Sequence, residues 1–128
     1  MLTISTKGPY ALQALVELGR AGDGPVSIGE LARRREIPTQ FLEQLFAALR
    51  RAGVLRSQRG VKGGYSFARR PEDLTVLEIV ELLDGPLGAG AHGVFADAAA
   101  AAREVLAATT VADLVERERQ AVAPMYYI

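Results

Sequence analysis

Residues 38–67, PTQFLEQLFAALRRAGVLRSQRGVKGGYSF, contain a helix followed by a glycine-rich hairpin. Pro38 and Thr39 suit the first turn of a helix. Gly53 stands where a left-handed C-terminal cap is expected, so the helix is predicted to end at Ala52. The apolar residues of this helix recur at helical spacing and should face the core: Phe41, Leu42, Leu45, Phe46 and Leu49.

Two short strands are predicted after this helix, over residues 54–57 and 65–67. The segment between them, residues 59–64, contains three glycines, which permit positive φ and close backbone approach. Upstream, Ser27 and Glu30 fit a capping box that opens a short helix. Two helices joined by a short turn and followed by a hairpin indicate a winged helix-turn-helix.

Capping and helix-breaking residues predict four further helices, over residues 7–20, 76–84, 94–107 and 111–120. Ser5 and Thr6 can cap the first of these helices. Thr75 and Glu78 form a capping box for the second, and Thr110 can cap the last. The predicted fold class is therefore mainly α with a small β-hairpin wing.

The helix over residues 94–107 carries an apolar stripe that has no obvious partner within a small winged domain. We expect this stripe to pack against the same helix of a second subunit, which predicts a homodimer. The chain then divides into a winged helix-turn-helix DNA-binding domain, residues 1–84, and a second part, residues 85–128, with a loose Gly/Ala connector, the dimerisation helix and a C-terminal tail. The predicted dimerisation residues are Phe95, Ala98, Ala102, Val105 and Leu106.

The charges divide the chain in two, although the net charge is zero. Residues 1–70 carry 12 Lys and Arg against 5 Asp and Glu, whereas residues 71–128 carry 3 against 10. Residues 50–70 alone hold seven basic residues and no acidic one. A stripe of one sign on a projecting element suits a polyanion, because neutralised phosphates release condensed counterions. Double-stranded DNA is therefore the first expected partner.

The composition argues against several other classes of protein. Because the chain has no cysteine, it has no disulfide framework and no cysteine-ligated metal centre. His92 is the one histidine, so neither a metal site nor a cofactor is predicted. Acidic pairs such as Glu78 with Glu81 have no companion base or nucleophile, so an enzyme is not expected. The sequence predicts no transmembrane helix and no secretory signal, and a cytoplasmic location is expected.

The order of these elements, with four short motifs, resembles the Rrf2 family of bacterial transcriptional regulators. The motifs are STKG at residues 5–8, FLEQL at 41–45, AGVL at 52–55 and RGVKGGY at 59–65. The resemblance covers almost the whole chain and implies a winged helix-turn-helix dimer that binds an imperfect palindrome in DNA. Several members carry three cysteines that ligate an iron-sulfur cluster. This chain has only His92 in that connector, so the cluster-sensing role is not implied.

Residues 103–114, REVLAATTVADL, and the terminal residues 125–128, MYYI, are similar to the cysteine-metabolism repressors of this family. The similarity implies repression of cysteine and sulfur metabolism genes, with cysteine synthase as corepressor. It also implies that the terminal isoleucine resembles the tail that serine acetyltransferase inserts into the active site of that enzyme. The predicted partner tail is Tyr126, Tyr127 and Ile128. A tail folded back on its own dimer is the alternative.

Residues near the start of a recognition helix reach base edges in the major groove, where Gln and Thr donate and accept and Glu accepts from cytosine. The predicted base readers are Thr39, Gln40, Glu43 and Gln44. Basic side chains and glycine amides of the wing can enter a minor groove or hold phosphate. The predicted wing contacts are Arg59, Gly60, Lys62, Gly63, Gly64 and Tyr65. A solvated helix face and a plain hairpin turn would explain the same residues without DNA.

Secondary phosphate contacts are predicted at helix starts, at the end of the helix that stops at Ala52 and on the strand after it: Ser5, Lys7, Ser27, Arg50, Arg51 and Arg56. Capping and helix-end electrostatics are sufficient alternative causes at these positions. Arg33, Arg34 and Arg35 are expected to be solvated. Two other functions stay open: a protein-interaction module whose tail binds cysteine synthase, with DNA binding lost or secondary, and a small-molecule sensor with its pocket in the dimer helices.

Overall fold

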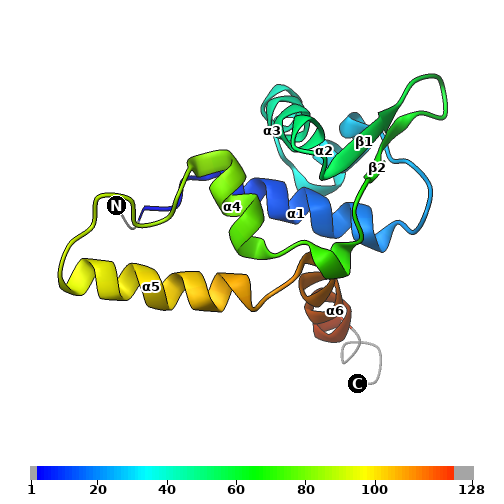
Figure 1. The fold of residues 1–128 in the computed structure, drawn as a ribbon. Helices are drawn as coiled ribbons and strands as arrows, with labels where there is room; N and C mark the ends of the chain where they lie inside the picture. Colours follow the sequence, from blue (N-terminus) through cyan, green and yellow to red (C-terminus); the bar gives the residue numbers. More distant parts are fainter. Residues whose placement is uncertain (1–2, 123–128) are drawn as a thin grey trace.

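The computed structural model describes residues 3–122, and most of these residues are helical (Figure 1). Helix α1 lies at the centre, with α2, α3 and a two-stranded hairpin above it in the view and α5 and α6 below it. The predicted class, mainly α with a small hairpin wing, is confirmed. The elements are α1 Lys7–Arg20, α2 Ile28–Arg35, α3 Thr39–Arg51, β1 Leu55–Gln58, β2 Gly64–Phe67, the 3₁₀ turn η1 Pro71–Asp73, α4 Val76–Asp84, α5 Val94–Ala107 and α6 Val111–Val122.

The core surrounds α1, which contacts α2, α3, α4 and α6. Ala11 and Ala14 are completely buried, and such small side chains let neighbouring helices approach closely. The predicted inner face of α3 is confirmed, since Leu42, Leu45, Phe46 and Leu49 are buried. Phe41 is half-buried, and its ring meets the ring of Tyr10 edge-on at 5.7 Å. The core therefore holds α3 by one face and leaves the other face free.

The helix-turn-helix is built from α2, a three-residue turn and α3. Helix α2 ends at Arg35 and is capped by Glu36, whose φ of +55° is a left-handed conformation that residues other than glycine rarely adopt. Ile37 follows and is buried, and its amide donates to the carbonyl of Ala32 at 2.9 Å. Gly53 has a φ of +80°, which confirms the predicted left-handed cap after α3.

The capping boxes predicted at Ser27 and Thr75 are only half formed. Each hydroxyl accepts from the amide three residues later, at 3.2 Å for Ser27 and 3.1 Å for Thr75. The carboxylate of Glu30, however, accepts from arginines, and so does that of Glu78. The prediction of a returning carboxylate bond was therefore wrong, because a guanidinium is a stronger partner for a carboxylate than a neutral backbone amide.

The caps of the first and last helices also differ. Thr110 caps α6 in both directions: its hydroxyl accepts from the amide of Asp113 at 3.0 Å, and its own amide donates to the Asp113 carboxylate at 2.9 Å. At α1 the predicted Thr6 side-chain cap does not form. The hydroxyl of Ser5 instead accepts from the amide of Lys7 at 3.2 Å.

The hairpin pairs β1 with β2 antiparallel, from Leu55 opposite Phe67 to Gln58 opposite Gly64. Both strands extend one residue nearer the turn than the sequence predicts, because the ladder continues to the Gln58–Gly64 pair. A third segment joins the sheet at Val26, whose backbone exchanges two hydrogen bonds with Tyr65, at 3.0 and 2.8 Å. The wing is thus anchored to the chain that leads into α2.

The connector between α4 and α5 is not loose, as predicted, but packed. Leu87 is buried, and a Cβ atom added at Gly88 would lie 2.4 Å from the Cβ of Ala99 in α5. The carboxylate of Glu81 on α4 accepts from the amide of Leu87 at 2.9 Å and also pairs with Arg103 of α5. These contacts hold α5 against α4 by one face.

Helix α6 returns to the first part of the chain and packs on α1 and η1. Val111 and Val115 are buried, and the amide of Val111 donates to the carbonyl of Leu74 at 2.8 Å. Gly19 permits the close approach, since a Cβ atom there would lie 2.8 Å from a methyl group of Val115. Within residues 3–122 no helix has the length and apolarity that crossing a membrane requires.

Candidate nucleic-acid interface

The polar face at the start of α3 is open to solvent. The core fixes the opposite face of the helix, so the exposed positions follow from its 3.6-residue period. None of their side chains has a hydrogen-bond or ion-pair partner within residues 3–122, so all can turn toward a ligand. These exposed residues are the four predicted base readers, Thr39, Gln40, Glu43 and Gln44.

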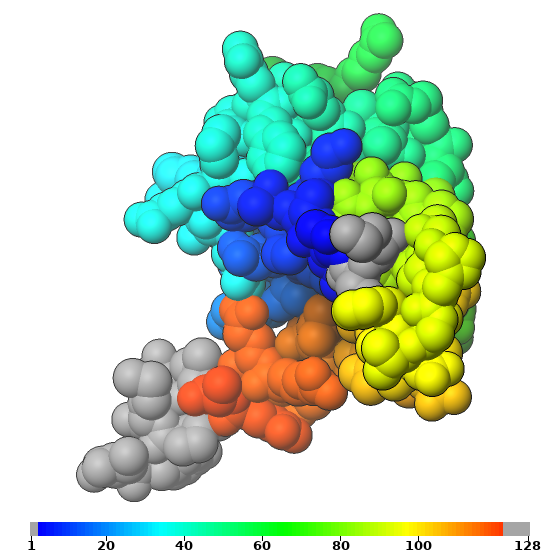
Figure 2. All heavy atoms as spheres, turned by 90° about the vertical axis from the view of Figure 1, so that its left-hand side faces the viewer, coloured from blue at the N-terminus to red at the C-terminus, as the bar shows by residue number. Residues whose placement is uncertain are grey.

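The wing and the start of α3 project from the same end of the molecule. In Figure 1 both lie at the top, beyond α1, whereas α5 and α6 lie below it. Figure 2, turned by 90°, shows that the segment around residue 40 and the green hairpin both lie at the upper end, with α6 at the lower end. A single duplex can therefore contact both elements, as a winged helix-turn-helix requires.

The seven basic residues of segment 50–70 separate into two groups. Arg69 pairs with Glu78 at 2.6 Å, and Arg70 pairs with Glu72 at 2.8 Å. Arg56 turns back and donates to the carbonyl of Phe67 at 3.1 Å. The other four are exposed and form no ion pair within the described part of the chain: Arg50, Arg51, Arg59 and Lys62. The positive charge available to a polyanion is therefore smaller than the sequence indicates.

The structure explains why glycines are needed in the wing. The amide of Gly63 donates to the carbonyl of Gly60 at 3.0 Å, which closes the turn. Added Cβ atoms would lie 2.1 Å from the Gln58 oxygen at Gly63 and 2.3 Å from the Val26 oxygen at Gly64. The glycines thus shape the turn and let β2 reach Val26. A phosphate contact of the Gly63 amide stays a prediction, and it requires that amide to leave Gly60.

Two wing residues have positions that the sequence does not predict. Tyr65 is half-buried, and its ring meets that of Phe46 edge-on at 5.2 Å, so it anchors the wing to the core. Val61, which is not among the predicted wing contacts, is fully exposed at the tip between Arg59 and Lys62. Its place in the middle of a six-residue turn was the one available signal. An apolar side chain at such a tip suits the walls of a minor groove.

The predicted secondary phosphate contacts are partly occupied. The carboxylate of Asp84 accepts from both the amide and the hydroxyl of Ser5, at 3.1 and 2.5 Å. The Ser27 hydroxyl caps α2, whereas the Lys7 side chain is exposed. Phosphate binding at these three residues stays a prediction, and at Ser5 it competes with Asp84.

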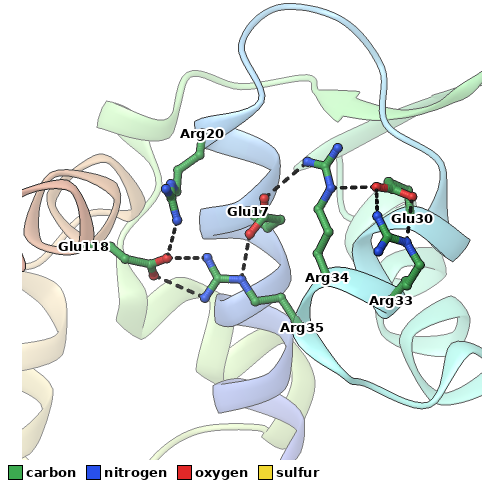
Figure 3. A network of polar contacts seen from close by, with 7 residues as sticks. All are labelled: Glu17, Arg20, Glu30, Arg33, Arg34, Arg35 and Glu118. Atoms are coloured by element: carbon green, nitrogen blue, oxygen red, sulfur yellow. Dashed lines mark hydrogen bonds and ion pairs between the residues drawn. The ribbon is translucent and has the colours of Figure 1, made fainter. Parts of the chain in front are cut away.

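Arg33 and Arg34 are exposed, as expected, whereas the Arg35 side chain is only 17% exposed, and all three form ion pairs. Figure 3 shows them in a network of ion pairs with Glu17, Glu30 and Glu118. Hydrogen bonds from Arg33 and Arg34 lower the pKa of Glu30 to about 2. The network neutralises most of the basic charge of α2, so α3 and the wing are left as the cationic elements at this end.

The family model for Rrf2, described as an iron-dependent transcriptional regulator, matches residues 4–117. The transcriptional regulator CymR of Bacillus subtilis is 33% identical over 138 aligned residues, which cover 99% of this chain and 100% of that protein. The transcriptional regulator IscR of Cereibacter sphaeroides is 43% identical over 100 residues, which cover 72% of this chain and 64% of that protein. The matched region thus spans less than two thirds of the IscR relative.

Two solved structures extend the likeness to three dimensions. The structure of CymR, described as the global cysteine regulator of B. subtilis, has a TM-score of 0.82 and 35% identity, and the match covers 91% of this chain and 98% of that one. The structure of T. potens IscR has a TM-score of 0.81 and 37% identity, with 94% and 90% covered. Both identities exceed the level at which only the fold is shared.

The residues present do not fit the iron centre that the family description suggests. The sequence contains no cysteine and one histidine, His92, which is exposed just before α5. Within residues 3–122, no three His, Cys, Asp or Glu side chains gather as metal ligands would. Soft thiolate ligands are what iron-sulfur clusters need, so this chain offers no cluster site of that kind.

Proposed function

The chain belongs to the Rrf2 family of transcriptional regulators, and we propose that it binds a palindromic operator in DNA as a homodimer. It is a DNA-binding regulator similar to CymR and IscR proteins. The observation that carries the proposal is the shared direction of the polar start of α3 and the cationic wing (Figure 2). Base edges would be read by α3, while the wing and the end of α3 would hold phosphates.

The dimer is proposed from the free face of α5. Val94, Phe95 and Val105 are 71%, 64% and 65% exposed, and Ala98 is exposed between them. The predicted stripe needs one adjustment, because Ala102 and Leu106 are half-buried and turn toward the side of buried Ala99. The free face packed against its symmetry mate would place two recognition helices one helical turn of DNA apart, about 34 Å.

The proposed division of the chain follows from this arrangement. Residues 1–84 would form the DNA-binding domain, and residues 85–128 would supply the connector, the dimerisation helix and the tail. Helix α6 is shared between the two roles, since it belongs to the second part in sequence but packs on α1. We expect the regulator to act in the cytoplasm, where bacterial DNA is held.

The regulated genes are proposed to be those of cysteine and sulfur metabolism, with the protein as their repressor. The support is the similarity to CymR over nearly the whole chain, together with the description of that relative as a global cysteine regulator. Genome-wide footprinting of the bound sites tests this proposal directly. Sites upstream of sulfur genes that are derepressed by deletion of the protein are expected. Sites beside unrelated genes only would contradict the assignment.

A second candidate is an interaction module whose tail binds cysteine synthase, with DNA binding lost or secondary. The predicted tail residues Tyr126, Tyr127 and Ile128 lie outside the described residues, so the support is their resemblance to the tails of the cysteine-metabolism repressors. Calorimetry with cysteine synthase, comparing the full chain with one that ends at Met125, tests it. Equal heats of binding from both chains would remove the tail from the proposal.

A further inference from the structure

The polar network of Figure 3 joins α1 and α2, which are consecutive in sequence, to the distant helix α6. Glu17 and Arg20 belong to α1, Glu118 belongs to α6, and the remaining members belong to α2. Two shared carboxylates connect the network through α1 and α6, because Glu17 pairs with Arg34 and Arg35, and Glu118 pairs with Arg35 and Arg20. The helix-turn-helix is thus tied by charge to the last helix of the chain.

Arg35 is the centre of this connection. Two nitrogens of its guanidinium donate to the two oxygens of Glu118 at 2.6 and 3.2 Å, and Nε donates to Glu17 at 2.9 Å. The Arg35 side chain is only 17% exposed. Burial alone would lower the pKa of Arg35, but the bonds from Glu118 and Glu17 outweigh burial and raise it. The pair therefore stays ionised and orients both side chains.

The position of Arg35 lets its pairing with Glu118 affect the turn into α3. Arg35 is the last residue of α2, directly before Glu36 and the turn into α3. The apolar contacts of α2 and α3 with α1 fix which faces are buried, but the hydrophobic attraction itself is non-directional. A forked guanidinium between two carboxylates is directional, and it fixes where α2 ends relative to α1 and α6.

We propose that Glu118, acting through Arg35, is a positioning residue for α3 and so sets the affinity for the operator. This inference rests on the proposed function. Helix α6 is itself held in place, since buried Val115, one turn before Glu118, packs closely against Gly19 of α1. Among the described residues, removal of the Glu118 charge leaves Arg35 with one carboxylate and Arg20 with none, so the turn into α3 loses its link to α6.

The test compares Glu118→Gln with Glu116→Gln in the full chain. Both substitutions remove one negative charge from α6, so the change in net charge is the same. Within residues 3–122 the Glu116 carboxylate accepts hydrogen bonds only from Arg119 and Gln120 of its own helix, so its loss leaves the network intact. Fluorescence anisotropy with the footprinted operator and with random DNA, at one salt concentration, gives the specificity ratio. Glu118→Gln is expected to lower that ratio roughly tenfold relative to Glu116→Gln.

Arg35→Lys supplies a second variant, because it keeps the charge but removes the fork. The same fall in specificity ratio is expected, and circular dichroism checks that each variant is folded at the assay temperature. Equal ratios for Glu118→Gln and Glu116→Gln would overturn the inference. Equal losses of Arg35→Lys on operator and random DNA would also overturn it, since they indicate a direct phosphate contact. Absence of an operator preference in the unaltered chain would instead refute the proposed function.

Discussion

Gly64 is the residue on which the seating of the wing depends. It has a φ of +150°, and a Cβ atom there would lie 2.3 Å from the backbone oxygen of Val26. Gly64→Ala combines backbone strain with a clash against main chain, which cannot move aside as a flexible side chain would. We expect a loss of about 3 kcal/mol in the free energy of unfolding, measured by urea denaturation.

Gly60→Ala is the matched control for this prediction. Gly60 also has a positive φ, +108°, but nothing lies within 4 Å of an added Cβ atom. Its alanine variant should therefore lose only the backbone term, about 1 to 2 kcal/mol. If both variants lost the same free energy of unfolding, the close approach of Gly64 to Val26 would not be what holds the wing in place.

These glycines also show how far residue-scale prediction reaches. The cluster of three predicts a tight turn and a close approach, because glycine permits both. The partner in that approach, Val26, is 38 positions away and carries no local signal, so only the folded chain identifies it. The exposure of the predicted base readers could be predicted for the opposite reason, since helical period alone places Gln40 and Gln44 on the face away from the core.

At the scale of elements, α3 and the wing should differ in what they contribute to binding. Gln44 lies on the exposed polar face of α3, and Arg59 lies on the wing without an ion pair in the described part of the chain. Gln44→Ala should weaken discrimination at one operator position by about 1 to 3 kcal/mol, whereas Arg59→Ala should weaken binding evenly across sequences. Competition assays with single-base operator variants measure both effects. The same pattern of losses from both variants would refute this division.

Helix α5 allows a separate prediction about assembly. Val105 is 65% exposed, so Val105→Asp should disturb the single subunit little but place an unpaired charge in the proposed dimer interface. We expect the dimer dissociation constant to rise roughly tenfold or more by sedimentation, with operator binding weakened in parallel. Ala100→Asp, exposed about 140° further round the helix, is the control and should remain dimeric. Unchanged dimers of Val105→Asp would place the interface elsewhere.

The element bounds were largely predictable, whereas the links between elements were not. Local signals such as Thr75, Thr110 and Gly53 lie within a few residues of the boundaries they set. Local signals of the same kind predicted that the carboxylates of Glu30 and Glu78 cap their helices, but both carboxylates form ion pairs with arginines instead. Arg35 and Glu118 are 83 positions apart, and long-range ion pairing leaves no periodic trace in sequence.

At the scale of the whole molecule, the charge division governs how binding responds to salt. The sequence offers seven cations between residues 50 and 70, but Arg69 and Arg70 are paired with acids and Arg56 bonds a carbonyl group. Four cations per subunit are left without such partners within residues 3–122. A dimer that uses all four on each side neutralises eight phosphates. Because each neutralised phosphate contributes about −0.9, the slope of log affinity against log salt concentration should be about −7.

The measured slope distinguishes four available cations per subunit, as in the structure, from the seven that the sequence contains between residues 50 and 70. If all seven cations of each subunit held phosphates, the slope would be nearly twice as steep, about −13. Anisotropy titrations of the operator between 50 and 300 mM salt measure this slope. Lys62→Ala should make the slope of the dimer shallower by about 2, since it removes one phosphate contact from each subunit. Arg70→Ala is the matched control, because its guanidinium is already paired with Glu72 and its loss should leave the slope nearly unchanged. An equal change of slope for both variants would show that DNA separates the Arg70–Glu72 ion pair. An affinity independent of salt would exclude phosphate neutralisation by the wing altogether.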